Sequence, residues 1–252
     1  MVKEFKTGVR RKKAPNPTNW QFADQPEAKM LNKVVLPRKI SLKSKFPPAY
    51  TQTCGSCTAN ATLACDAYYY HDPKSSWLPS TVFTYYNSRK MDGCKPSDPD
   101  DGSTVETALN AVRKYGACNE VCWPNTEPYN KKPSKEAYAN GLKGHEITKY
   151  YQVKTFLQLK KALANGYPVA GAVAWCFKDY DNEFVMNHVT KKEADKCDYG
   201  HAIVFVGYDD DEQLIEFRNS WSEEWANDGY AYMTYETFKN VIWFDDTYAI
   251  VR

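Results

Sequence analysis

The pattern of apolar and polar positions changes about halfway along the chain. Residues 58–70 are rich in alanine and contain neither glycine nor proline, which predicts a helix packed closely on all sides. Val105, Leu109 and Val112 share one face of a second predicted helix, which ends at Gly116. Helical periodicity therefore dominates the first half of the chain.

The start of that second helix and the segments after it carry further signals. Ser103 and Glu106 match a capping box, in which two side chains satisfy exposed backbone donors. A third helix is predicted over 155–165. Short apolar or alternating runs then predict strands over 169–175, 202–208, 214–217 and 229–234. Segregated helical and β halves favour an α+β fold whose two lobes face each other across a cleft.

The chain of 252 residues is long enough for one large domain made of two lobes. Residues 1–45 have scattered prolines, many lysines and no sustained period, which indicates a basic N-terminal extension. A mainly helical lobe is expected over 46–150 and a mainly β lobe over 151–252. The first 50 residues hold 12 Lys and Arg against 3 Asp and Glu, while the whole chain carries a net charge of only +2. This basic extension, called the leader below, precedes an acidic remainder of the chain, called the body. We expect the leader either to dock on the body or to form a solvated tail.

Composition and charge exclude or disfavour several classes of protein. No stretch approaches the roughly 20 apolar residues that cross a bilayer, which excludes an integral membrane protein. The small net charge does not favour a dedicated nucleic-acid binder, although the basic run at 10–13 would suit a weak nucleic-acid contact or a nuclear address. The first residues lack the apolar core of a signal peptide, so we expect a cytoplasmic protein or, if the chain is viral, one associated with the virion.

One of the 8 cysteines lies where a thiol enzyme needs its nucleophile. The reactive species is the thiolate, so the pKa of the thiol has to fall from about 8.5, and both a helix N-terminus and a neighbouring imidazolium favour the anion. Cys57 lies where a glycine-containing loop becomes the first predicted helix. His201 opens a predicted strand and is the best placed of the 4 histidines to supply the imidazole. Asn219, after the next strand, would accept a hydrogen bond from the ring and fix its tautomer.

Three short blocks that contain these residues resemble the active-site blocks of papain-like cysteine peptidases. The blocks are Cys54-Gly55-Ser56-Cys57, Gly200-His201-Ala202 and Asn219-Ser220-Trp221, in the order of that family. His201 follows Cys57 by 144 residues, within the interval of about 130–150 typical of the arrangement. Downstream segments look closer to the microbial and large-virus branch of the family than to animal cathepsins. The resemblance implies a papain-like two-lobed fold, with Cys57 on the helical lobe and His201 and Asn219 on the β lobe.

The resemblance also implies an activity, the hydrolysis of peptide bonds through a thioester. In this hypothesis Cys57 attacks the carbonyl carbon, His201 forms an ion pair with the thiolate and then protonates the leaving amine, and Asn219 holds the ring. Gln52 and the backbone N–H of Cys57 would bind the oxyanion, although Gln52 lies one position closer to Cys57 than is usual in the family. Trp221 would shield the hydrogen bond between the ring and Asn219 from water.

Substrate subsites follow from the same resemblance. Gly102 and Ser103 align with the glycine pair whose backbone binds the extended substrate by strand addition. Ala172 and Ala202 would line the pocket for the second residue before the scissile bond, and small walls suit a bulky apolar side chain there. The expected partner is a peptide or protein substrate, with no cofactor, no metal and no membrane, and the oligomeric state stays open.

Alternative interpretations of the cysteines and of the function stand beside these. Cys54 and Cys57 with Cys118 and Cys122 could form a zinc site, although the two pairs differ in spacing. The resemblance implies a disulfide between Cys54 and Cys94, and the alternative is a pair of reduced thiols. For the whole chain, an endopeptidase is the first hypothesis. The others are a papain-like domain that binds without cleaving and an exopeptidase whose cleft is partly blocked.

Overall fold

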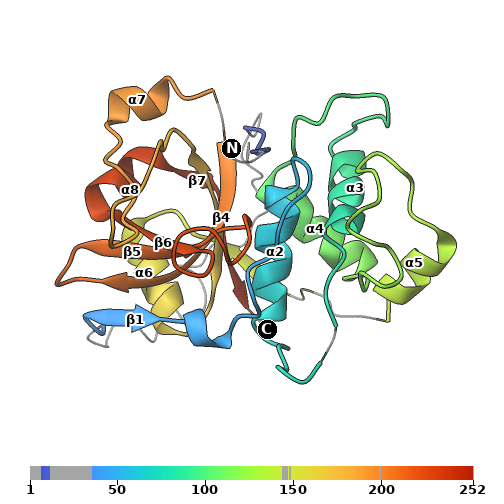
Figure 1. Ribbon diagram of the computed structural model, residues 1–252, viewed down its shortest axis with the longest axis horizontal. Coiled ribbons are helices and arrows are strands. Elements are labelled where there is room, and N and C mark those ends of the chain that lie inside the picture. The colour runs from blue at the N-terminus through green and yellow to red at the C-terminus, as the bar shows by residue number, and fades with distance from the viewer. Residues whose placement is uncertain are drawn as a thin grey trace.

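The computed structural model describes residues 7–11, 36–75, 77–143, 147, 149–198 and 200–251. Lys12 and Lys13 of the basic run, and most of the predicted extension, lie outside the described residues. The described chain forms two halves side by side, one made of helices and one built on a sheet (Figure 1). The predicted α+β fold of two lobes is confirmed.

The helical lobe is organised around a helix that is buried along its whole length. All 11 residues of this helix, α2 (Cys57–Ala67), are buried, and its small side chains let neighbouring elements approach from every side. It packs against two helices of its own lobe and against two strands of the other lobe. The other helices of this lobe are α3 (Thr81–Met91), α4 (Val105–Tyr115) and α5 (Lys135–Gly141). The alanine-rich helix is confirmed, with its ends at 57 and 67 rather than at 58 and 70.

The second predicted helix is confirmed as α4, but its N-cap lies one residue later than predicted. The side chain of Thr104 accepts a hydrogen bond from the N–H of Thr107, as an N-cap does. Ser103 instead donates its hydroxyl to Asp92 (Oγ–Oδ2 2.6 Å), so the predicted capping box is wrong. The apolar face of α4 is buried as expected, and Gly116 ends the helix with a positive φ of 68°.

The other lobe is a seven-stranded sheet in which all described pairs are antiparallel. The strand order is β2-β7-β3-β4-β5-β6, and β1 pairs with β4. The strands are β1 (Lys39–Ser41), β2 (Lys149–Gln152), β3 (Val169–Ala174), β4 (Gly200–Asp209), β5 (Leu214–Arg218), β6 (Tyr230–Thr234) and β7 (Ile242–Val251). The four predicted strands correspond to β3 through β6.

Three strands and several helices have no counterpart in the sequence prediction. β1 lies in the stretch assigned to the extension, where the strand is mostly exposed and so shows no apolar alternation. The helices of this lobe are α6 (Phe156–Ala164), α7 (Lys191–Asp195) and α8 (Tyr235–Val241), with a 3-10 turn η3 (Lys43–Lys45) after β1. Of these, α6 alone was predicted, and the side chain of Thr155 caps it by accepting the N–H of Gln158.

The two lobes are joined by buried polar contacts as well as by apolar packing. The carboxylate of Asp246 in β7 accepts hydrogen bonds from the N–H groups of Val105 (2.8 Å) and Glu106 (3.1 Å), at the N-terminus of α4. Negative charge is favourable there because the first N–H groups of a helix lack partners within it. None of the described helices is long and apolar enough to cross a membrane.

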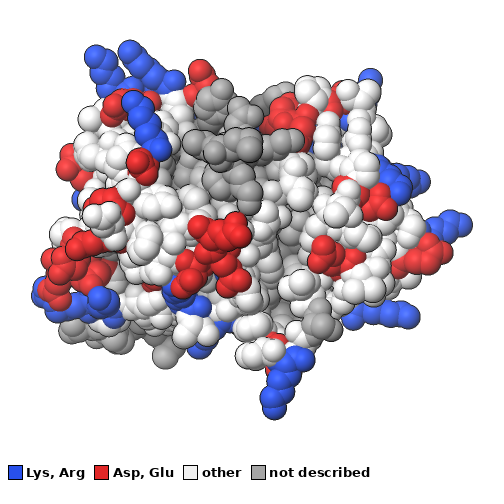
Figure 2. All heavy atoms as spheres, viewed as in Figure 1, with Lys and Arg blue, Asp and Glu red and all other residues white. Residues whose placement is uncertain are grey.

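Basic residues of the N-terminal stretch meet acidic residues of the body in the described parts of the chain. Arg38 forms an ion pair with Asp211, in the turn between β4 and β5, and Lys39 forms one with Asp209, the last residue of β4. Acidic and basic side chains accordingly lie next to one another at the left end of the face in Figure 2. For residues 36–41 the docked alternative therefore describes the chain better than a solvated tail.

Candidate active site

Cys57 lies at the border between the lobes, as the first residue of α2. Its side chain is fully buried, and its Sγ accepts hydrogen bonds from the backbone N–H groups of Ala202, Gly8 and Thr58. Ala202 directly follows His201 in β4, so the sulfur contacts the strand that carries the histidine. These N–H groups favour the thiolate, but burial outweighs them and raises the pKa of Cys57 to about 12. In this state the thiol is protonated at neutral pH.

The imidazole of His201 is held by Asn219, which follows β5. Nε2 of the ring lies 2.8 Å from Oδ1 of Asn219, and the same oxygen accepts the N–H of Ser220 at 2.8 Å. An amide oxygen only accepts, so Nε2 carries the proton and Nδ1 presents a lone pair. Nδ1 is buried and has no hydrogen-bond partner among the described residues. Burial lowers the pKa of His201 to about 4, although the bond to Asn219 acts in the opposite direction.

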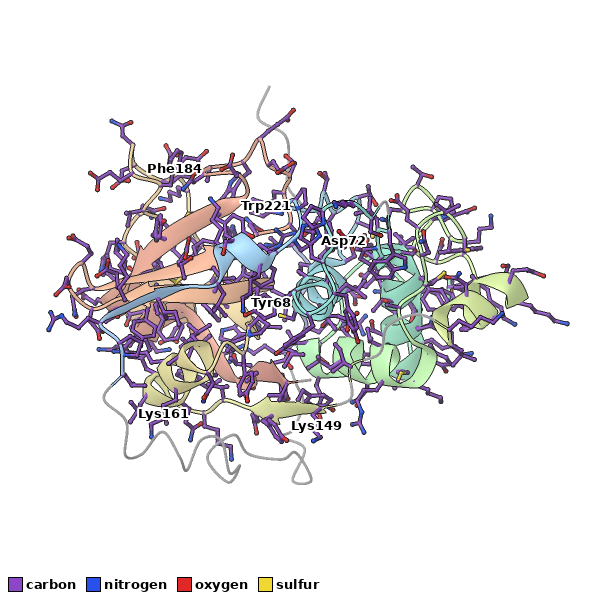
Figure 3. The ribbon with its side chains drawn as sticks, turned by 90° about the horizontal axis from the view of Figure 1, so that it is seen from below. Tyr68, Asp72, Lys149, Lys161, Phe184 and Trp221 are labelled. Carbon is purple, nitrogen blue, oxygen red and sulfur yellow. The ribbon has the colours of Figure 1, made fainter. Side chains whose placement is uncertain are left out.

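Two indole rings enclose the imidazole. The ring of Trp221 lies over His201 at a centroid distance of 4.9 Å, tilted by 32°, and Trp175 meets it edge-on at 4.7 Å. Figure 3 shows Trp221 near the border between the sheet and the helices. The sequence placed Trp221 in the site but gave Trp175 only as the end of a strand. Its position follows from the pairing of Ala174 with Gly200, which brings Trp175, the residue after β3, beside the start of β4.

Gln52 lies beside the site and links the loop before Cys57 to the segment after Asn219. Its Nε2 donates to the carbonyl oxygen of Cys54 (2.9 Å), and its Oε1 accepts the hydroxyl of Ser220 (2.5 Å). The backbone N–H of Gln52 also donates to the carbonyl oxygen of Ser220. The amide is therefore positioned from both lobes, with one donor directed at Cys54.

The leader crosses this site. Residues 8–10 pair with Ser103 as in a parallel ladder, because the N–H of Arg10 donates to Ser103 O (2.9 Å) and the N–H of Ser103 donates to Gly8 O (3.1 Å). On the other side, the N–H of Val9 donates to Gly200 O at 3.1 Å, and the Val9 side chain is buried. The short segment thus spans both lobes at their junction (Figure 1). Gly102 and Ser103, the expected strand-addition site, are occupied by the protein's own chain.

Close approach and charge fix the segment in place. A Cβ on Gly8 would overlap the carbonyl oxygen of Gly55, so only glycine fits at this point of the leader. The guanidinium of Arg10 forms an ion pair with Asp101, which is also paired with Arg89 at 2.7 Å. The leader therefore contacts the acidic body here as well, and in this part of the chain it is docked.

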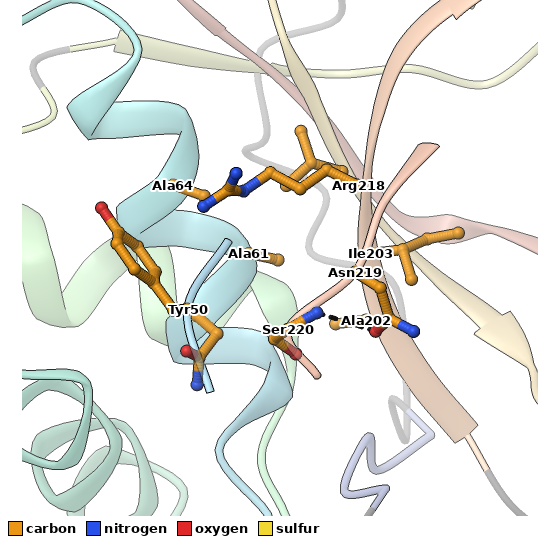
Figure 4. Close-up of a pocket in the computed structure, with 10 residues that line it drawn as sticks. Tyr50, Ala61, Ala64, Ala202, Ile203, Arg218, Asn219 and Ser220 are labelled. Atoms are coloured by element: carbon orange, nitrogen blue, oxygen red, sulfur yellow. Dashed lines mark hydrogen bonds between the residues drawn. The ribbon is translucent and has the colours of Figure 1, made fainter. Parts of the chain in front are cut away.

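Ala172 and Ala202 lie opposite each other on β3 and β4, and both are buried. Ala202 also reaches a cavity of about 10 Å³ behind the site, which Tyr50, Asn60 and Arg218 help to line (Figure 4). A space of this size admits about one water molecule. The cavity lies between α2 and the ends of β4 and β5, so it adjoins the Asn219 side chain rather than the leader.

The cysteines near the site are all reduced. Cys54 and Cys94 do not form the disulfide that the resemblance implied, and that expectation is wrong. Cys94 instead accepts a hydrogen bond from Arg10 (3.0 Å), and the N–H of Gly55 beside Cys54 donates to the carboxylate of Asp100 (2.9 Å). Among the described residues, no three His, Cys, Asp or Glu side chains are grouped to hold a metal ion, so the zinc alternative has no support.

Comparisons with known proteins agree with this architecture. The family model for papain family cysteine proteases matches residues 38–242. An uncharacterised peptidase C1-like protein of Acanthamoeba polyphaga mimivirus is 31% identical over 205 residues, which are 73% of this chain and 63% of that protein. Peptidase 1 of Dermatophagoides farinae is 22% identical over 231 residues, 85% of this chain and 66% of that protein. The chain spans somewhat less than two thirds of the length of these relatives.

Solved structures show the same fold. Xylellain, a cysteine protease from Xylella fastidiosa, superposes with a TM-score of 0.76 at 29% identity, over 98% of this chain and 96% of that one. Digestive procathepsin L2 from Tenebrio molitor larval midgut superposes with a TM-score of 0.70 at 15% identity, over 98% of this chain and 78% of that one. The viral and bacterial relatives agree with the expected microbial and large-virus branch. Because the family model matches most of the sequence and the fold is shared, the chain belongs to the papain family of cysteine proteases.

Proposed function

We propose that the chain is an endopeptidase that hydrolyses peptide bonds through a thioester on Cys57. The observation that carries the proposal is the orientation of His201, whose Nε2 is engaged by Asn219 while Nδ1 is left without a described partner. Nδ1 is the atom that can take the proton of a thiol. The Cys57 sulfur contacts the N–H of the residue next to this histidine, which supports their acting together.

In the proposed reaction, Nδ1 of His201 accepts the thiol proton and the sulfur attacks the substrate carbonyl carbon. The N–H of Cys57 and Nε2 of Gln52 bind the oxyanion, and donors of this kind contribute roughly 3–4 kcal/mol each. The imidazolium then protonates the leaving amine, and water hydrolyses the thioester with the neutral imidazole as base. Asn219 keeps the His201 ring oriented. Trp221 and Trp175 exclude water from the hydrogen bond between His201 and Asn219.

We infer that the substrate backbone takes the place that the leader occupies. Ser103 then bonds to the substrate by strand addition, and Gly102 allows the close approach. In this proposal Ala172 and Ala202 would border the pocket for the second residue before the scissile bond, and their small side chains would suit a bulky apolar side chain there. The N–H of Gly8 contacts the Cys57 sulfur, so the leader covers the proposed nucleophile and has to leave before a substrate binds.

The function is tested with end-blocked, internally quenched peptides and an epoxide thiol reagent. The full chain is compared with Cys57→Ser and with Cys94→Ser, which removes another thiol beside the leader. We expect cleavage within the peptide and reagent attachment to require Cys57 and to survive in Cys94→Ser. Cleavage that persists in Cys57→Ser, with the same inhibitor sensitivity, would exclude the proposed nucleophile.

A papain-like domain that binds without cleaving is the second candidate function. The observation in its favour is that Gln52 directs its Nε2 at Cys54 O while burial keeps both Cys57 and His201 neutral. A folded protein whose Cys57 stays unreactive, even after removal of residues 1–11, would support this candidate. An exopeptidase would instead cleave free-ended peptides faster than end-blocked ones, whereas equal rates indicate an endopeptidase.

A further inference from the structure

A pair of thiols outside the proposed machinery lies where β3 and β4 diverge. Cys176 follows the last residue of β3 by two positions, and Cys197 precedes the first residue of β4 by three. Ala174 pairs with Gly200 at the last position of this antiparallel ladder. Both cysteines therefore lie just beyond the same end of the two paired strands.

Their side chains meet. The thiol of Cys176 is in hydrogen-bond contact with the thiol of Cys197, and both are half-buried against the core of the β lobe. The chain between them contains α7 and returns to its starting point, so a bond here would close a loop around that helix. Half-exposure leaves the pair open to a small reagent, unlike the buried Cys54, Cys57 and Cys65.

We propose that Cys176 and Cys197 form a disulfide when the protein meets a small-molecule disulfide such as oxidised glutathione. The thiolate of one cysteine attacks the glutathione disulfide, which forms a mixed disulfide and releases one glutathione as its thiolate. The second cysteine, as its thiolate, attacks the protein sulfur of that mixed disulfide, and the second glutathione leaves. The two protein thiols lose two protons and two electrons in total, and both are found in the two reduced glutathione molecules. Burial raises the pKa of Cys176 to about 12, so its thiol is protonated before the reagent arrives.

The bond would constrain the wall around His201. Trp175 immediately precedes Cys176, and its ring contacts both His201 and the ring of Trp221, which lies 5.0 Å away. On the other strand, Cys197 lies four residues before His201. A covalent link between these positions would hold the indole wall against the ring and stabilise the segment that carries α7.

Mass spectrometry of the full chain and of its peptides tests the bond without relying on the protein's own peptidase activity. The wild type and the variants Cys176→Ser, Cys197→Ser and Cys118→Ser are equilibrated with mixtures of reduced and oxidised glutathione, alkylated and digested. We expect the wild type to lose two hydrogens, about 2 Da, and to yield a peptide in which Cys176 is linked to Cys197. Cys118→Ser is the matched control, because Cys118 lies near Cys122 in the other lobe, and it should form the same link.

The outcomes separate cleanly. Each of Cys176→Ser and Cys197→Ser should retain a thiol or carry one glutathione at the remaining cysteine, and neither should gain the stability to heat that oxidation gives the wild type. Only mixed disulfides in the wild type, or a link from either cysteine to a third one, would overturn the proposal. Because mass is the readout, failure here leaves the proposed peptidase activity untouched, and an inactive protein would still report the bond.

Discussion

Asn219 accepts two hydrogen bonds at one oxygen, from the His201 ring and from the N–H of Ser220. The backbone bond fixes which way the amide faces, and the amide in turn fixes the tautomer of the ring. In the proposed reaction Asn219 would therefore act only through His201. A residue of this kind should influence the chemical step more than substrate binding.

We predict that Asn219→Ala lowers kcat about 10- to 100-fold and leaves KM nearly unchanged. A hydrogen bond to a group that becomes charged contributes about 1.5–3 kcal/mol, and each 1.4 kcal/mol is a factor of about ten in rate. Asn87→Ala is the control, since it removes a buried amide from the helical lobe and should reduce stability without changing kcat. An unchanged kcat, or a loss confined to KM, would contradict a positioning role.

At the scale of residues, the short motifs around the site predicted more than the apolar and polar periodicity did. The motifs predict that His201 and Asn219 lie together, and the two side chains are in hydrogen-bond contact. Trp175 was missed because its place depends on the β3–β4 register, which no local signal encodes. Ser103 was assigned as a cap because the pattern cannot show that its hydroxyl is engaged by Asp92, leaving the cap to Thr104.

At the scale of elements, a single carboxylate of one lobe satisfies the end of a helix in the other lobe. Asp246 of β7 satisfies the N-terminal N–H groups of α4, so a strand of one lobe completes a helix of the other. β7 was not predicted, because two aspartates interrupt its apolar run and one of them is this buried cap. Sequence patterns find elements that bury one continuous face, and they miss elements whose polar residues have distant partners.

We predict that Asp246→Ala lowers the free energy of unfolding by about 1–2 kcal/mol, the usual loss when helix N-terminal donors lose a carboxylate partner. Urea unfolding followed by circular dichroism measures the change. Asp195→Ala provides the matched control, because its exposed carboxylate in α7 is 2.8 Å from Lys191 and such pairs contribute little. Equal effects of the two substitutions would show that the α4 contact is not a stabilising cap.

The leader segment is a second element whose role depends on one residue. We predict that Gly8→Ala raises the peptidase rate of the full chain about tenfold, because the added methyl group overlaps Gly55 O and an overlap costs about 1–3 kcal/mol of leader binding. Initial rates on the quenched peptide measure the effect, and deletion of residues 1–11 gives the upper limit. Gly93→Ala controls for general destabilisation, since alanine is strained at the φ of +82° there while its added Cβ meets nothing within 4 Å. A rise on deletion without a rise in Gly8→Ala would place the main contact elsewhere in the leader.

At the scale of the whole molecule, the burial of His201 and Cys57 makes the free energy of unfolding depend on pH. Burial lowers the pKa of His201 from 6.5 to about 4. Between these two pH values the ring is protonated in the unfolded chain and neutral in the folded chain. The stability due to the neutral ring is complete above pH 6.5 and is lost as the pH falls toward 4. Cys57 acts with the opposite sign, since its pKa is raised from 9.0 to about 12 and its contribution declines as the pH rises above 9.

We therefore predict that the wild type loses on the order of 3 kcal/mol of unfolding free energy between pH 7 and pH 4 that His201→Gln does not lose. Urea unfolding at several pH values measures the difference between the two proteins, which cancels the carboxylates common to both. Gly8 contacts Cys57, and Val9 bonds to Gly200 beside His201. Removing residues 1–11 should therefore admit water to the ring and reduce the difference between the wild type and His201→Gln. Parallel curves for the wild type and His201→Gln would show that the ring is ionised in the folded state, and an unchanged difference after deletion would show that the lobes alone bury it.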